Sequence, residues 1–255
     1  MNRNPKNDWA YYRRGQAYYH LAEYQKAIDD AASAIKLDPE YAGAFLLRGS
    51  SFFHLGSYQE AANDFTRAIE INPSRAVTAY VYNNRAVAYA ELKKYQEGLS
   101  DINRAIALDP QVSRYTDRGY IYRGMRKYQE AFDDYDYALK LDPKSIEAYL
   151  GRGDIYYDLK QYRKALADYE QALSLDPGNR HALTECGTAY YQFGENAQAL
   201  DIVTRAVATN PEDPNADHGR GSVYYELKDY QKAVEDFNRS IELNPEYADA
   251  YNGRG

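Results

Sequence analysis

Apolar residues recur at three- and four-residue spacing along most of the chain, which is the period of an amphipathic helix. In residues 146–176 a first apolar row consists of Tyr149, Gly153, Tyr156 and Leu159. After a short polar turn, a second row consists of Ala165, Leu166, Tyr169, Ala172 and Leu173. The pair Asp176–Pro177 follows the second row, and proline disfavours helix in the residue before it. The pattern predicts two helices joined by a short turn.

This two-helix pattern repeats, and prolines that follow Asp or Asn mark its period. They are Pro39, Pro73, Pro110, Pro143, Pro177, Pro211 and Pro245. Aligning the glycine or alanine that comes about ten residues after each proline gives seven repeats. We place them at residues 8–41, 42–75, 79–111, 112–145, 146–179, 180–213 and 214–247, with a partial repeat at 248–255 and Pro5 left from a preceding repeat. The chain is therefore expected to be a single repeat array over residues 1–255.

One insertion interrupts the period, at residues 74–78 before the third repeat. Three extra residues there either lengthen the loop or lengthen the first helix of the third repeat. The sequence leaves both alternatives open.

The repeated pattern resembles the tetratricopeptide repeat, in which small and aromatic residues recur through two helices and a proline follows. The fourth repeat carries the pattern at Tyr115, Gly119, Tyr122, Ala131, Tyr135, Ala138 and Pro143. The resemblance implies an all-α solenoid, a right-handed superhelix of antiparallel helix pairs. It also implies that the first helix of each pair lines a concave groove that binds a peptide or a partner helix.

The chain departs from the family pattern at two positions. An arginine stands before the glycine, where the family usually has leucine, and an aspartate follows 16 positions later, as in Arg118 and Asp134. The sixth repeat lacks both, with Cys186 and Ile202 instead. The joint loss predicts an ion pair inside each repeat, as at Arg48–Asp64, Arg118–Asp134 and Arg152–Asp168. The alternative is a ladder of arginines for phosphate or acidic ligands.

The family geometry assigns particular first-helix positions to the groove. In this chain, the residues that we expect to bind a partner are Tyr12, Tyr19, Phe53, Tyr80, Asn83, Asn84, Tyr120, Arg123, Asp154, Tyr157, Asp158, Tyr191 and Tyr225. Aromatic rings beside acidic groups suit a peptide with apolar and basic residues. The alternative for each aromatic residue is that it braces adjacent first helices.

Composition narrows the chemistry. The formal net charge of −7 argues against nucleic-acid binding, and the single cysteine excludes a disulfide framework or a multi-thiolate zinc site. Phosphate-loop and nucleophile motifs are absent, so we expect no enzyme, no cofactor and no metal. There is neither an apolar membrane-spanning stretch nor a signal peptide in residues 1–8, and a cytoplasmic protein without membrane contact is expected.

The 29 tyrosines mostly fall at four framework positions, those of Tyr115, Tyr122, Tyr128 and Tyr135 in the fourth repeat. Three hypotheses for function remain. The first is a non-catalytic scaffold that binds a protein or peptide in the groove. The second is self-association, in which uncapped terminal repeats stack end to end into a homo-oligomer. The third is a recognition segment of a larger, even enzymatic, protein.

Overall fold

The computed structural model describes residues 7–71 and 75–245, and every regular element within them is an α-helix. Pro5, Ser74 and the partial repeat at 248–255 lie outside the described residues. The chain forms two compact units, residues 1–134 and residues 135–255. Each unit is described by itself below.

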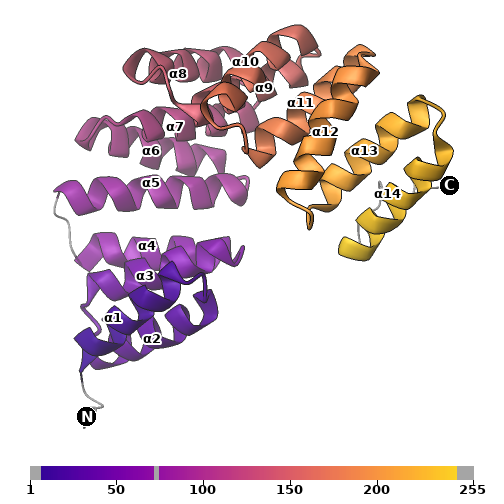
Figure 1. Cartoon of the computed structure of the whole chain (residues 1–255). Helices are drawn as coiled ribbons and strands as arrows, with labels where there is room; N and C mark the ends of the chain where they lie inside the picture. The colour runs from indigo at the N-terminus through magenta and orange to yellow at the C-terminus, as the bar shows by residue number, and fades with distance from the viewer. Residues whose placement is uncertain (1–6, 72–74, 246–255) are drawn as a thin grey trace. The chain divides into compact units, whose positions relative to one another are not determined.

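Within its described residues, 7–71 and 75–134, the N-terminal unit (residues 1–134) contains seven helices and the start of an eighth. They are α1 (Asp8–His20), α2 (Tyr24–Leu37), α3 (Ala42–His54), α4 (Tyr58–Ile71), α5 (Arg75–Glu91), α6 (Tyr95–Leu108), α7 (Val112–Gly124) and α8 (Tyr128–Leu141), which continues past the boundary. In this unit each helix from α1 to α6 packs on the next, and α1, α3, α5 and α7 also contact one another in order. Successive helices therefore lie side by side (Figure 1).

The C-terminal unit (residues 135–255) repeats this arrangement. Its further helices are α9 (Ile146–Asp158), α10 (Tyr162–Leu175), α11 (Arg180–Phe193), α12 (Asn196–Thr209), α13 (Pro214–Glu226) and α14 (Tyr230–Leu243). Each of these helices packs on its neighbour in sequence, and the first helices α9, α11 and α13 contact one another in order. The expected all-α solenoid of helix pairs is confirmed.

Small residues let the paired helices approach closely. On α4, the fully buried residues Ala61, Ala62, Phe65 and Ala68 recur at helical spacing and form the face that meets α3 and α5. On α3, Gly49 lies against the Phe65 ring, and a Cβ added to Gly49 would come within 2.9 Å of it. A larger residue at Gly49 would therefore push the two helices apart.

The second helices end where the Asp–Pro and Asn–Pro pairs predict. Helix α2 ends at Leu37, and its C-cap Asp38 already has the extended dihedrals φ −132° and ψ 97°. The C-cap residues Asp176 and Asn244 also have extended dihedrals, after α10 and α14. Because proline excludes the helical conformation from the residue before it, these pairs set the end of each helix.

The insertion lengthens a helix. The helix α5 has 17 residues, whereas the first helices α3, α7 and α9 have 13 each. Residues from Arg75 onward are already helical, so the added residues extend α5 at its N-terminus. The sequence alone could not decide this, because three residues fit a loop or a helix equally well.

Candidate functional site

Arginine–aspartate pairs join the two helices of every described repeat that has both residues. They are Arg14–Asp30, Arg48–Asp64, Arg85–Asp101, Arg118–Asp134, Arg152–Asp168 and Arg220–Asp236. Each is bidentate; in the fourth repeat Arg118 Nε and Nη2 donate to the two carboxylate oxygens of Asp134 at 2.8 and 2.7 Å. The hydrogen bonds to Asp134 raise the pKa of Arg118 above its ordinary value. These guanidinium groups already bind aspartates within the fold. Few of their N–H donors therefore remain for phosphate ligands, which disfavours the alternative of an arginine ladder.

The same arginines also reach back to the preceding repeat. Arg85 Nη1 donates to Thr66 Oγ1 at 2.8 Å, and Arg118 Nη1 donates to Asn103 Oδ1 at 2.8 Å. Arg152 Nη1 reaches Asp136 Oδ1 at 2.6 Å. One guanidinium therefore ties together three helices, because its planar fork presents several donors in fixed directions.

In the sixth repeat an apolar contact replaces the ion pair. Cys186 is fully buried, and Ile202 packs against the same apolar cluster. Burial raises the pKa of the Cys186 thiol to about 12. A thiol with so high a pKa stays protonated and is a poor nucleophile.

Two adjoining cavities lie on the first helices of the N-terminal unit. The larger, about 280 Å³, is lined by Tyr19, Ser50, Phe53, His54, Phe65, Tyr80, Asn83, Asn84, Val87 and Asp117. The smaller, about 170 Å³, is lined by Tyr12, Gln16, Tyr19, His20, Gly43, Leu46, Leu47, Ser50 and Tyr80. Because they share Tyr19, Ser50 and Tyr80, we call them together the N-terminal groove.

Hydrogen bonding leaves one polar atom of the N-terminal groove unsatisfied. Asn83 Nδ2 donates to Asp117 Oδ2 at 2.7 Å, which orients the amide. Asn83 Oδ1 is buried and accepts no hydrogen bond within the described part of the chain. A buried carbonyl oxygen without a donor costs about 1–3 kcal/mol.

Aromatic rings make the walls of the N-terminal groove. The Tyr19 hydroxyl lies 2.9 Å from His54 Nε2, and the His54 ring stacks on Tyr24 with centroids 4.6 Å apart. Phe53 packs edge-on against Tyr58, whereas Tyr80 is 51% exposed. Tyr80 is thus a large apolar surface that the fold leaves available for contact.

Six of the expected partner-binding residues line the N-terminal groove: Tyr12, Tyr19, Phe53, Tyr80, Asn83 and Asn84. Arg123 lies in the last turn of α7 and Asp158 ends α9, and neither lines these two cavities. The Tyr120 hydroxyl donates to Glu91 Oε1 at 2.8 Å, and burial together with this bond raises the pKa of Tyr120. Binding by any of these residues stays a prediction.

Other expected residues have partners of their own in the C-terminal unit. Asp154 Oδ1 accepts a hydrogen bond from the Tyr169 hydroxyl at 3.0 Å and lies 3.2 Å from His181 Nε2. Tyr157 and Tyr225 pack edge-on against the tyrosines that begin the following helices, Tyr162 and Tyr230, with centroids 5.3 and 5.4 Å apart. These aromatic residues therefore brace the second helix of their own repeat. Tyr191 lines a separate pocket considered below.

Sequence reasoning missed several groove residues, among them Ser50, His54, Phe65 and Val87. His54 shares its repeat position with His20, which was visible as a repeated histidine in adjacent repeats. Phe65 comes from the second helix α4 and reaches the cavity past the small residues of α3. No first-helix pattern could have indicated it. Asp117 belongs to a position next to those that the family assigns to the groove.

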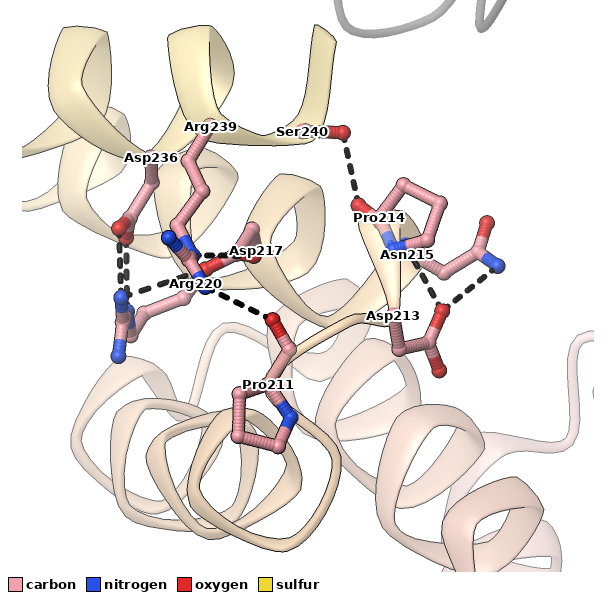
Figure 2. A network of polar contacts seen from close by, with 9 residues as sticks. All are labelled: Pro211, Asp213, Pro214, Asn215, Asp217, Arg220, Asp236, Arg239 and Ser240. Carbon is pink, nitrogen blue, oxygen red and sulfur yellow. Dashed lines mark hydrogen bonds and ion pairs between the residues drawn. The ribbon is translucent and has the colours of Figure 1, made fainter. Parts of the chain in front are cut away.

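A polar network fixes the seventh repeat, where α13 meets α14 (Figure 2). Arg220 binds both oxygens of Asp236 and lies 3.5 Å from Asp217 Oδ1. Asp217 is 1% exposed, and its Oδ2 accepts no hydrogen bond from the described residues. Arg239 Nε lies 3.4 Å from that oxygen. Burial of the carboxylate raises the pKa of Asp217 above its ordinary value.

The loop before α13 is part of the same network. Arg239 Nη2 donates to the Pro211 carbonyl at 2.9 Å, and Ser240 Oγ donates to the Pro214 carbonyl at 2.7 Å. Asp213 caps the N-terminus of α13 by accepting from the Asn215 backbone N–H at 3.0 Å. Both helices of the seventh repeat are thus tied to residues 211–215.

Metal and membrane sites are not indicated in the residues described. No group of three His, Cys, Asp or Glu side chains within them is placed to hold a metal ion. Within residues 7–71 and 75–245, no helix is both long and apolar enough to cross a bilayer.

Solved structures with the same fold are numerous. A tetratricopeptide repeat protein from Parabacteroides merdae is 19% identical, with 97% of each chain covered and a TM-score of 0.74. The Cut9–Hcn1 hetero-tetramer of the APC/C matches at 16% identity over 98% of this chain and 49% of that one, with a TM-score of 0.75. YrrB, described as a TPR protein with an unusual peptide-binding site, is 24% identical over 76% of this chain and 98% of its own, with a TM-score of 0.54.

Comparison with sequence profiles of protein families identifies the family of the chain. No curated protein matches the chain in sequence. Tetratricopeptide repeat profiles match residues 12–76, 79–112, 146–179 and 218–247, and a further TPR repeat profile matches residues 119–160. Proteins of this fold are typically non-catalytic scaffolds that bind protein or peptide partners. The matches cover more than half of the sequence, and the chain belongs to the tetratricopeptide repeat family.

Proposed function

We propose that the chain is a protein-interaction scaffold whose N-terminal groove binds an extended peptide segment with apolar and basic side chains. The observation that carries the proposal is the buried acceptor Asn83 Oδ1, which belongs to a residue that lines the larger cavity. A peptide backbone N–H would give this oxygen the hydrogen bond that the fold does not supply.

The shape of the groove favours an extended segment. Its two cavities share three residues and together run over α1, α3 and α5, with Asp117 of α7 at one end. Two small cavities that share lining residues suit successive side chains of one extended peptide, which can place an apolar anchor in each. The published description of YrrB names a peptide-binding site in a related fold, which agrees with this use.

Charge favours a basic peptide. The Asp117 carboxylate lines the larger cavity, and the chain carries a formal net charge of −7. Lysine and arginine side chains are attracted by this charge, and their cationic groups also stack favourably on tyrosine rings such as Tyr80 and Tyr19. The apolar part of the preference comes from Phe53 and Val87.

Selection from a random peptide library tests the proposal. The full chain is immobilised, dodecapeptides are selected by phage display, and the enriched peptides are synthesised with a fluorescent label. We expect enrichment of Lys, Arg and apolar residues over Asp and Glu. Enrichment of acidic peptides would contradict the charge assignment, and failure to enrich any peptide would overturn the proposal.

Variants then locate the bound peptide. Asn83→Leu removes the acceptor and Tyr80→Ala removes the exposed ring, and we expect each to weaken binding about tenfold, or ~1.4 kcal/mol. Matched controls are Asn63→Leu on the exposed face of α4 and Tyr137→Ala on α8, which we expect to leave fluorescence anisotropy titrations unchanged. Light scattering on the same samples shows whether self-association contributes. Equal losses in test and control variants would place the peptide elsewhere.

A further inference from the structure

A third cavity lies in the C-terminal unit, between the first helices of the sixth and seventh repeats. It measures about 150 Å³ and is bounded by Gly187 and Tyr191 of α11 and by His218 and Gly219 of α13. Val203 of α12 forms its floor and is 3% exposed. These three helices are neighbours in the C-terminal unit (Figure 1). We call this cavity the Val203 pocket.

The size of one side chain accounts for the Val203 pocket. At the repeat position of Val203, four of the other repeats carry large aromatic rings, namely Phe65, Tyr135, Tyr169 and Phe237, whereas the first and third repeats carry Ala31 and Ile102. Each of these rings packs against a glycine on a first helix, as Tyr169 does on Gly153 and Phe237 on Gly221. Val203 contacts Gly187 in the same way but is shorter, so it fills less of the space.

The fourth and fifth repeats show where an aromatic ring at the repeat position of Val203 would lie. The Tyr135 ring lies directly over Gly151, and a Cβ added to Gly151 would overlap with that ring. Gly219 occupies the same repeat position as Gly151. A Cβ added to Gly219 would lie 3.7 Å from Val203 Cγ1 and would meet nothing closer. The place that a phenol ring takes over Gly151 is therefore open over Gly219.

The walls of the Val203 pocket suit an aromatic ring with a polar tip. Cavities of about 150 Å³ accept benzene in other proteins, and Tyr191 and His218 offer ring faces or edges for an aromatic pair. Thr188 Oγ1 and Ser222 Oγ, which also line the pocket, donate their protons to backbone carbonyls at 2.9 and 3.0 Å. Each oxygen therefore keeps lone pairs that accept a hydrogen bond from a phenol.

We propose that the Val203 pocket binds an aromatic side chain, that of a tyrosine or phenylalanine in a partner segment, in the place that Tyr135 takes over Gly151. The proposal is independent of the N-terminal groove, since none of its residues belongs to residues 1–134.

Binding is measured by NMR titration of the full chain labelled with 15N. The probes are p-cresol and the blocked tripeptides Ala-Tyr-Ala and Ala-Leu-Ala. We expect p-cresol and Ala-Tyr-Ala to cause saturable shifts of the Gly187 and Gly219 amides with dissociation constants in the millimolar range. Ala-Leu-Ala should cause weaker shifts. Binding of p-cresol without binding of Ala-Tyr-Ala would mean that the pocket takes a free phenol, which overturns the docking proposal.

Two variants fill the pocket from opposite sides. Val203→Phe places a ring on the floor, as in Phe237, and Gly219→Ala adds a methyl group where the backbone leaves room. We expect both to abolish the saturable shifts. The control is Gly178→Ala, whose added Cβ would come no closer than 3.7 Å to another atom and lies outside the pocket. Should Val203→Phe fail to fold, Gly219→Ala decides alone. Shifts that persist in the filled variants, or that never saturate, would overturn the proposal.

Discussion

At the scale of single residues, the arginine that recurs in all the described repeats except the sixth explains part of the tyrosine content. In the fourth repeat, Arg118 Cζ lies 5.6 Å from the Tyr115 ring centroid and 5.9 Å from that of Tyr122. The same guanidinium binds Asp134 through two hydrogen bonds. Cation–π contacts on both sides hold the guanidinium plane while the carboxylate neutralises it. The two tyrosines and Asp134 therefore hold the same guanidinium group in place.

Breaking the most buried of these pairs should be costly. The side chains of Arg85 and Asp101 are only 12% and 5% exposed. Arg85→Ala leaves the Asp101 carboxylate without its cation, so we expect the free energy of unfolding to fall by about 3 kcal/mol. Urea unfolding followed by circular dichroism measures the loss.

A double variant copied from the sixth repeat is the control. Arg85→Cys combined with Asp101→Ile reproduces the apolar contact of Cys186 and Ile202, and removal of both charges avoids an unpaired buried ion. We expect the double variant to be more stable than Arg85→Ala. If the double variant is as unstable as Arg85→Ala, the loss does not come from leaving the Asp101 carboxylate buried without its cation.

The buried Asp217 gives a pH-dependent prediction. Its pKa is raised above the ordinary 3.8, chiefly by burial, with Asp236 and Asp213 adding to the rise and Arg220 and Arg239 opposing it. The folded state thus holds the proton more tightly than the unfolded state. The stabilisation is present at low pH and is lost as the pH rises through the raised pKa.

Replacing Asp217 by its neutral analogue removes this dependence. Near neutral pH we expect Asp217→Asn to raise the free energy of unfolding by about 1 kcal/mol, because the neutral amide avoids the cost of burying a charged carboxylate. The difference should disappear at a pH below 3.8, where the wild-type carboxyl is protonated too. Thermal unfolding across this range provides the measurement. A variant that is less stable near neutrality would mean that attraction to Arg220 and Arg239 outweighs burial.

At the scale of elements, the turn between the two helices of a repeat has a left-handed residue. This residue is Ala22, Gly56, Lys93, Arg126, Lys160, Gly194 or Lys228, with φ between 56° and 83°. Glycine adopts this conformation without steric strain, whereas other residues pay about 1–2 kcal/mol for it. The five side-chain-bearing turns are held in place by the packing of the helices on either side.

Exchanging glycine and alanine in two neighbouring turns tests this strain. A Cβ added to Gly56 meets nothing within 4 Å, so Gly56→Ala changes only the backbone preference. We expect Gly56→Ala to lower the free energy of unfolding by about 1 kcal/mol. Ala22→Gly should have a smaller, opposite effect, since glycine also increases the entropy of the unfolded chain. Changes of the same sign in chemical denaturation would contradict the strain.

The sequence predicted elements better than it predicted site residues. Helical periodicity and the Asp–Pro pairs are local signals, so the helix pairs and the ends of the second helices followed directly from them. Whether a first-helix side chain is available for a partner depends on neighbours that only the fold brings together. Asp154 is occupied by Tyr169 and His181, and Tyr120 by Glu91, across separations of 15 to 29 residues. The contacts of Asp154 with His181 and of Tyr120 with Glu91 join different repeats, so no single-repeat pattern contains them.

The Val203 pocket likewise could not be predicted from the sequence alone. Val203 is smaller than the aromatic residues that four other repeats carry at its position, but a smaller side chain opens a cavity only where no other group fills the space. The cavity also needs Gly219 on the next first helix, 16 positions later in the chain. The two residues are unremarkable separately, and their meeting depends on the packing of α12 against α13.

At the scale of the whole molecule, each compact unit carries a cavity on its first helices. The N-terminal groove lies within residues 1–134, and the Val203 pocket lies within residues 135–255. Since neither site contains residues of the other unit, variants of one are expected to leave binding at the other unchanged. The two proposals therefore fail or succeed separately.

Peptide binding by the N-terminal groove, through Asn83 and the aromatic walls, can be tested directly. The most direct measurement is an NMR titration of the 15N-labelled full chain with a peptide enriched from the library. We expect the largest amide shifts in α1, α3 and α5, around Tyr19, Phe53 and Asn83. We also expect Asn83→Leu to reduce the affinity about tenfold. Shifts that centre on the second helices, or an affinity that Asn83→Leu leaves unchanged, would contradict binding in the N-terminal groove.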